Sequence, residues 1–188
     1  AATSIRNPLL PWAGRGLTDP SGPDQMERAD RLHAASMTYL EQVAGPDHAY
    51  AREALRRSNR ARPEDYLGAG PDFESAVLRG LNDIYPQKCA YLGEPALRAA
   101  IQDARELAGR YSADTDLGVA LFLGPAFALG RGFDHDPLLP WISKTLREPL
   151  GADPGRRVGR LYTRLKAYQG KVLASWERRQ GHVWLQHE

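Results

Sequence analysis

The chain has 188 residues and a net charge of +2, and its 42% apolar and 26% charged residues are typical of a globular domain with its own hydrophobic core. No run approaches the roughly 20 uninterrupted apolar residues that a membrane span needs, so the sequence predicts no membrane partner. The single cysteine, Cys89, excludes an internal disulfide framework and a cysteine-built zinc site, and it favours a cytoplasmic location.

The N-terminal 22 residues are rich in proline and glycine and lack sustained periodicity, which predicts an extended arm. We expect a single helical domain over residues 23–180 and a short tail over 181–188. Within the arm, Leu9, Leu10 and Trp12 form a short apolar element with an aromatic anchor. Such an element suits a groove on a partner or the surface of its own domain.

Beyond the arm, apolar residues recur at helical spacing in almost every segment, and no segment alternates with the period of a strand. Capping residues, glycines and prolines mark the ends of these segments. The fold class is therefore predicted as all-α, a compact bundle of about six or seven helices. The predicted helices run from Asp24 to Gly45, from Asp47 to Arg60, from Asp72 to Pro86, from Glu94 to Tyr111, from about Thr115 to Leu129, from Asp136 to Leu146, and from Asp153 through Arg179.

The stretch GRGFDHDPLLPW (130–141) places two carboxylates around an imidazole in Asp134, His135 and Asp136. A structural interpretation treats Asp136 and the following proline as the cap and first residue of a helix. The alternative is a hydrolase or metalloenzyme centred on these three side chains. The structural interpretation is favoured, because adjacent residues rarely converge on one ion.

No other pattern points to catalysis. Cys89 lacks the flanking residues of a known nucleophile motif, and an isolated cysteine is more often a small buried side chain. His33 and His48 belong to different predicted helices, and the sequence does not show whether they meet. Phosphate loops, dinucleotide motifs, serine elbows and Glu-x-x-His repeats are all missing from the sequence. We therefore predict no cofactor and no metal and favour a protein without catalytic activity, with the hydrolase or metalloenzyme as the open alternative.

The last predicted helix is basic: residues 151–188 carry a net charge of +5, against −3 for the rest of the chain. Arg156, Arg160 and Arg164 lie on the face opposite its apolar stripe, which is typical of a solvated surface helix. These arginines are candidate contacts for an acidic protein partner. Nucleic-acid binding is the weaker alternative, because the aromatic residues of this helix fall on its core side.

A resemblance adds to this interpretation. The run AIQDARELAGRYSADTDLGVALFLGPAFALGRGFDHDPLLPWISKTL resembles a class of small uncharacterised helical proteins encoded near bacterial toxin-delivery loci of the type VI secretion kind. The shared features are Tyr111 at a helix end, the acidic pair Asp114 and Asp116, an apolar helix, and the Gly-x-Gly-Phe-Asp-x-Asp-Pro turn followed by Pro-Trp. The resemblance covers roughly residues 95–165 and implies an adaptor, effector chaperone or immunity-type partner.

Taken together, the sequence predicts a non-enzymatic protein-interaction module. Its expected partner is another protein, a secreted toxin or a delivery component. The candidate contacts are those of the arm, Leu9, Leu10 and Trp12, and the three arginines of the last helix. The oligomeric state stays open.

Overall fold

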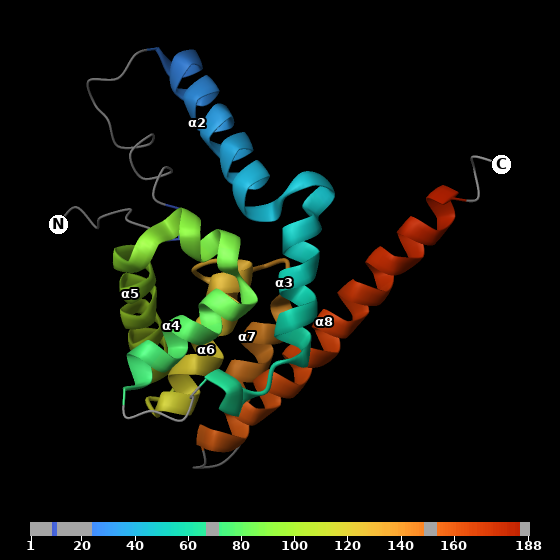
Figure 1. The fold of residues 1–188 in the computed structure, drawn as a ribbon. Helices are drawn as coiled ribbons and strands as arrows, with labels where there is room; N and C mark the ends of the chain where they lie inside the picture. The colour runs from blue at the N-terminus through green and yellow to red at the C-terminus, as the bar shows by residue number, and fades with distance from the viewer. Residues whose placement is uncertain (1–8, 11–23, 67–71, 149–153, 185–188) are drawn as a thin grey trace.

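The protein is a bundle of helices without a strand in the part of the chain that the structure describes, which confirms the predicted all-α class (Figure 1). This computed structural model describes residues 9–10, 24–66, 72–148 and 154–184. None of the helices in these ranges is both long and apolar enough to cross a membrane. Helices α4 to α7 and the first half of α8 form the body, and α2 projects from it (Figure 1).

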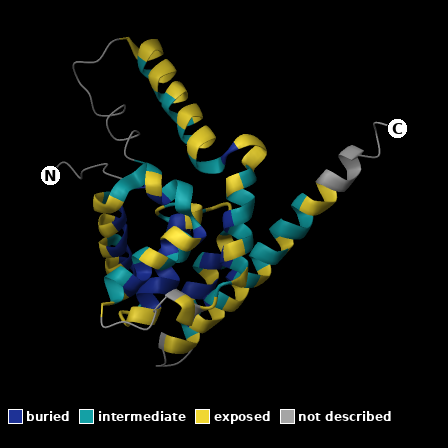
Figure 2. Ribbon diagram, in the orientation of Figure 1, coloured by how far each residue is buried: buried dark blue, intermediate teal, exposed yellow. Residues whose placement is uncertain are grey.

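Helix α2 (Gln25–Tyr39) projects from the body with most of its surface in solvent, and it continues into a π-helical turn, Leu40–Ala44. No residue of α2 is buried, as the yellow and teal colouring of Figure 2 shows. The predicted stop at Gly45 is confirmed. Its φ is 76°, and a Cβ there would lie 2.6 Å from the Tyr50 ring, so only glycine fits. This turn fixes the direction in which α2 leaves the body.

Helix α3 (Ala49–Arg60) starts later than predicted. A 3-10 turn, Pro46–His48, precedes it, and Asp47 and His48 have φ values of 47° and 59°. These left-handed conformations cannot propagate an α-helix, so the chain makes a sharp corner between α2 and α3.

Helices α4 (Phe73–Ile84) and α5 (Pro86–Arg110) are nearly continuous in sequence. Asp72 caps α4 as predicted, accepting a hydrogen bond from the Glu74 N–H. The predicted end of α4 at Pro86 is confirmed, since α4 stops at Ile84, and Pro86 also begins α5, where its missing N–H costs nothing. Gly93, with φ 73° and ψ 162°, breaks α5 just before the predicted start at Glu94.

Helix α6 (Asp116–Leu129) is the apolar centre of the bundle and runs through Pro125. Thr115 caps it, in place of the predicted Ser112 or Asp114, by accepting from the Gly118 N–H. Its most enclosed side chains, Phe122 and Phe127, are 0% exposed. The neighbouring helices cover α6 on several sides, which is why it is hydrophobic around much of its circumference.

Gly118→Ala is expected to lower the free energy of unfolding by about 3 kcal/mol, because an alanine Cβ would lie 2.0 Å from the carbonyl oxygen of Ala113. That oxygen belongs to the backbone, so the turn before α6 has to move. Gly159→Ala on α8 is the control: its Cβ meets nothing within 4 Å, and helix propensity predicts a gain of about 0.5–1 kcal/mol. Urea unfolding of both variants measures the difference. Equal effects of the two substitutions would contradict the packing described for α6.

The turn after α6 differs from its prediction. Gly130 and Gly132 take positive φ values of 101° and 92°, as expected for a helix stop, and Phe133–His135 form a 3-10 turn. Asp136 does not cap a helix. Its carboxylate accepts from the Leu138 N–H at 2.8 Å within a turn, and α7 (Pro140–Arg147) begins at the second proline of the PLLP stretch.

Helix α8 (Pro154–Trp184) is the longest and runs into the segment predicted as a tail. Its first half packs against α3, α6 and α7, while its second half extends beyond the body (Figure 1). The proposed cap Asp153 and most of the predicted arm lie outside the described residues. Of the arm, Leu9 is 4% exposed and belongs to the hydrophobic core, and Leu10 is partly exposed.

Candidate functional site

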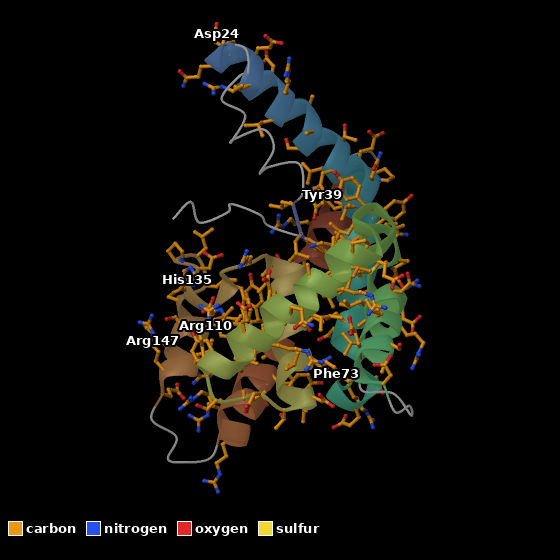
Figure 3. All side chains as sticks on the ribbon, turned by 90° about the vertical axis from the view of Figure 1, so that its left-hand side faces the viewer. Asp24, Tyr39, Phe73, Arg110, His135 and Arg147 are labelled. Carbon is orange, nitrogen blue, oxygen red and sulfur yellow. The ribbon has the colours of Figure 1, made fainter. Side chains whose placement is uncertain are left out.

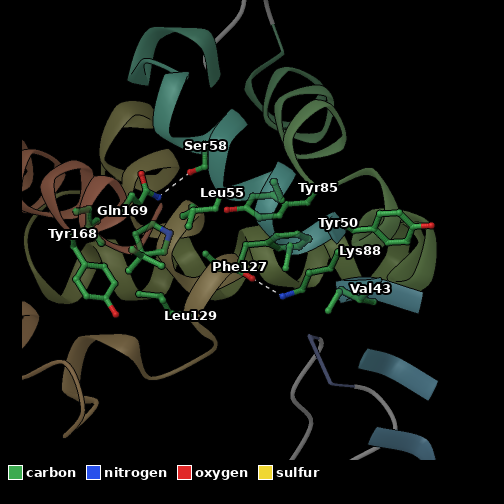
Figure 4. Close-up of a pocket in the computed structure, with 18 of the residues that line it drawn as sticks. Val43, Tyr50, Leu55, Ser58, Tyr85, Lys88, Phe127, Leu129, Tyr168 and Gln169 are labelled. Atoms are coloured by element: carbon green, nitrogen blue, oxygen red, sulfur yellow. Dashed lines mark hydrogen bonds between the residues drawn. The ribbon is translucent and has the colours of Figure 1, made fainter. Parts of the chain in front are cut away.

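An apolar groove lies between α3, α6 and α8, and the π-helical turn and the start of α5 close it at one end (Figure 4). Its volume is about 380 Å³, within the range of ligand pockets. We call it the apolar groove. Its larger lining residues are Tyr39, Val43, Tyr50, Leu55, Tyr85, Lys88, Phe127, Leu129, Leu165, Lys166, Tyr168, Val172 and Trp176.

Exposed apolar side chains gather at the mouth of this groove. Tyr50 and Leu129 line it and are 39% and 38% exposed. Met37 of α2 and Leu40 of the π-helical turn, which are also exposed at 52% and 44%, flank the lining residue Tyr39 in the sequence but do not themselves line the groove. Exposed apolar surface that adjoins a groove is typical of a site that another molecule covers.

The polar groups at the α8 side of the groove are used within the fold. Gln169 donates to the Ser58 hydroxyl at 3.0 Å. The Lys166 ammonium donates to the carbonyl oxygens of Ser58, Asn59 and Ala61 at the end of α3. Lys166 therefore caps a helix C-terminus, a stabilising place for a cation. Burial lowers its pKa below the ordinary value.

Lys88, at the other end of the groove, is different. Its ammonium donates to the carbonyl oxygen of Phe127 at 2.5 Å and lies 4.7 Å from the centre of the Phe127 ring (Figure 4). Burial lowers its pKa from 10.5 to about 8. Among the described residues no carboxylate forms an ion pair with it, and no Asp or Glu lines the groove.

Cys89, the next residue, points into the core and is 5% exposed. Burial raises the pKa of its thiol to about 11. We expect iodoacetamide at pH 8 to modify this thiol about a hundredfold more slowly than an unperturbed cysteine, because so little thiolate is present. Mass spectrometry over a time course measures the rate, with the protein unfolded in urea as the fast control. Rapid modification of the folded protein would contradict the burial of Cys89.

The structure brings together two of the three side chains of the acidic turn. The His135 ring nitrogen Nδ1 lies 2.9 Å from Asp134 Oδ1, and the Tyr111 hydroxyl donates to Asp134 Oδ2 at 3.0 Å. Asp134 is buried, whereas the His135 side chain is 69% exposed. Asp136 does not join them, since its carboxylate accepts from the backbone of its own turn.

The acidic turn therefore has a structural role: its Asp134 carboxylate accepts a hydrogen bond from the Tyr111 hydroxyl, which holds the turn against the end of α5. Figure 3 shows His135 at the margin of the body, well away from Tyr39, where α2 begins to meet it. His135 also lines a second hollow, of about 460 Å³, together with the charged side chains Asp103, Glu106, Arg110 and Arg131. No group of three potential metal ligands occurs among the described residues.

The arginines predicted to bind a partner lie on α8, and two of them make contacts within the chain. Arg160 and Arg164 both pair with Glu148, at 2.6 Å and 3.0 Å, and Arg164 also donates to the Thr145 hydroxyl at 2.5 Å. Arg156 is exposed. The structure thus shows two of the three arginines holding the end of α7 against α8.

The predicted partner contacts in the N-terminal arm differ in how far the structure exposes them. Leu9 is a core residue in this structure, so a partner reaches it only if the core opens, because its side chain packs in the main hydrophobic cluster. Leu10 is partly exposed. Trp12 lies outside the described residues, and its role stays a prediction.

No protein-family model, curated protein or solved structure matches this chain. Sequence reasoning missed the groove, since its walls come from helices about a hundred residues apart. The available signal was Lys88, a lone cation in the otherwise uncharged run IYPQKCAYLG.

Proposed function

We propose that this protein is a non-enzymatic interaction module that binds a segment of another protein in the apolar groove. The observation that carries the proposal is the pair of exposed apolar side chains Tyr50 and Leu129 in a groove lined mainly by apolar and aromatic side chains. Aromatic residues in such hollows supply most of the binding energy in protein interfaces.

The partner segment expected here is an amphipathic helix with acidic residues. Two lysines and no carboxylate line the groove in the part of the chain that the structure describes, so its charge complements an acidic partner. Helix α2 and the outer half of α8 both project from the body, one on either side (Figure 1). A helix lying between them would cover the exposed side chains of α2, which has no buried residue of its own.

The resemblance of residues 95–165 indicates the class of partner, which is a secreted toxin or a component of its delivery system. This protein would then act in the bacterial cytoplasm as an adaptor, an effector chaperone or an immunity-type protein. This part of the proposal rests on that resemblance alone. The groove supports the binding role and says nothing of the partner's name.

Photo-cross-linking in the native host tests the proposal. A benzoylphenylalanine in place of Tyr50 or Leu129, the two exposed residues that line the groove, is expected to form a covalent adduct with one and the same protein. The control position is Gln102, exposed on the part of α5 remote from the groove. The captured protein is then purified and its binding measured by calorimetry with the unmodified chain and with Tyr50→Asp.

Binding in the micromolar range or tighter that Tyr50→Asp weakens at least tenfold would support the proposal. Adducts formed equally from Gln102, or binding indifferent to Tyr50→Asp, would overturn it.

A second candidate, a hydrolase, is favoured by one contact: the buried Asp134 carboxylate holds the exposed imidazole of His135. A carboxylate that orients an imidazole in this way leaves the other ring nitrogen free to act as a general base. Hydrolysis of a panel of activated esters, abolished by His135→Ala and reduced by Asp134→Asn, would establish it. Absence of activity, or activity equal in both variants, would reject it.

A further inference from the structure

At its Lys88 end, the apolar groove contains a buried ammonium group with N–H donors that could bind an anion. The ammonium has three N–H donors, and the one hydrogen bond described for it, to the Phe127 carbonyl, uses one of them. That carbonyl lies in the last turn of α6, where the helix supplies no N–H partner for it. The remaining donors have the groove beside them, as Figure 4 shows.

The surroundings of Lys88 are apolar and aromatic. Tyr50, Tyr85, Val43 and Phe127 lie around it in the groove. A cation in such a place has already lost most of its hydration in the folded protein. An anion that reaches it therefore gains a charge-assisted hydrogen bond without a second desolvation of the lysine.

The charge of Lys88 is not matched from within the described chain. Apart from Lys88, the titratable side chains that line the groove in the described structure are five phenols and one ammonium, and none is a carboxylate: Tyr39, Tyr50, Tyr85, Tyr162, Tyr168 and Lys166, which the end of α3 occupies. Burial raises the pKa of Tyr39, Tyr85 and Cys89, so these three stay neutral near pH 7.

We infer that Lys88 is the anion seat of the groove and selects a carboxylate flanked by apolar groups, as an acidic side chain of an amphipathic partner helix presents it. This inference rests on the proposed function and names the chemistry of the partner. The volume of about 380 Å³ accommodates one acidic side chain with its apolar neighbours rather than a whole helix. The rest of the helix would lie across the rim.

Octanoate and octanol are suitable probes, since they share an apolar chain and differ in the carboxylate. Titration of the ¹⁵N-labelled protein at pH 7, followed by NMR, gives an affinity and a map of the residues that respond. Octanoate is expected to bind at least tenfold more tightly than octanol, with the largest shifts at Tyr50, Lys88 and Phe127.

Lys88→Met keeps the length and apolar body of the side chain and removes its charge. In this variant octanoate and octanol are expected to bind alike. Lys144→Met is the matched control, because Lys144 is exposed on α7 away from the groove. It should keep the preference of the unmodified chain. Thermal unfolding of each variant shows that it is folded before it is titrated.

The pH dependence of octanoate binding is a second test of the role of Lys88. Octanoate should bind the unmodified chain about tenfold more weakly at pH 9 than at pH 7, because the Lys88 ammonium loses its proton near pH 8. Octanol binding should not change over this range, and neither should the affinity of Lys88→Met for octanoate.

Equal affinities of octanoate and octanol for the unmodified chain would overturn the assignment of Lys88, and so would a preference that survives in Lys88→Met or the absence of any binding. The cross-linking experiment judges the docking surface independently. A partner captured from Tyr50 whose binding is indifferent to Lys88→Met would keep the proposed function and reject the anion seat.

Discussion

Phe122→Ala is expected to lower the free energy of unfolding by about 3–5 kcal/mol, the usual cost of emptying a buried aromatic site. Phe122 is 0% exposed, and its ring stacks on Tyr111 at 5.4 Å and contacts Phe133 at 6.3 Å between ring centres. One substitution therefore removes the packing that joins α5, α6 and the acidic turn. Urea unfolding monitored by circular dichroism measures the loss.

The control for this prediction is Leu117→Ala on the same helix, where the side chain is 38% exposed and the expected loss is about 1 kcal/mol or less. Phe122→Leu keeps part of the volume and serves if the alanine variant does not fold. A loss at Phe122 no larger than that at Leu117 would show that α6 is not the centre of the core.

Lys88→Met is expected to change how stability depends on pH. Folding lowers the pKa of Lys88 from 10.5 to about 8, so in that window the unfolded chain still binds the proton that the folded chain has lost. The free energy of unfolding of the unmodified chain therefore rises, relative to that of the variant, as pH increases from 8 to 10.5. The relative gain is about 3 kcal/mol over the whole window.

Urea unfolding of both proteins between pH 7 and 10.5 measures this difference, and the tyrosines and Cys89, present in both, largely cancel. Lys144→Met again serves as the control, because its lysine is exposed and the difference should stay flat. A flat difference for Lys88→Met would mean that the Lys88 ammonium is well solvated, and the argument for an anion seat would lose its basis.

Much of the fold followed from local signals in the sequence. Apolar residues at helical spacing located the helices, and Asp72 and Gly45 marked boundaries correctly, because a cap or a left-handed turn depends on neighbouring residues alone. The proline positions were less certain guides. Pro86 marked the end of α4 correctly, but the start of α5 at the same residue was missed, since a proline suits the first turn of a helix as well as the residue after one.

The acidic turn shows the same limit. In the stretch Asp-Pro-Leu-Leu-Pro, both prolines are candidates for the first residue of α7, and the sequence favoured the first. Asp136 instead accepts from the Leu138 N–H within a turn, which delays the helix to Pro140. Aspartate closes a turn as readily as it caps a helix, and the choice depends on how Phe133 and Ile142 pack in the core.

The groove was beyond local reasoning altogether. Tyr50, Phe127 and Trp176 meet there from α3, α6 and α8, and nothing in their immediate neighbours indicates that they share a surface. The arginines of α8 show the opposite case. Their amphipathic spacing was visible, but the pairing of Arg160 and Arg164 with Glu148 depends on how α7 packs on α8.

The central claim is that a partner binds in the apolar groove, between α2 and the outer half of α8. Hydrogen exchange tests this claim most directly. In the free protein the amides of α2 should exchange far faster than those of α6, because α2 has no buried residue to hold it. With the cross-linked partner bound, protection should increase in α2, in α3 around Tyr50 and in the outer half of α8. Protection confined to the turn around His135, with α2 and α3 unchanged, would contradict the account.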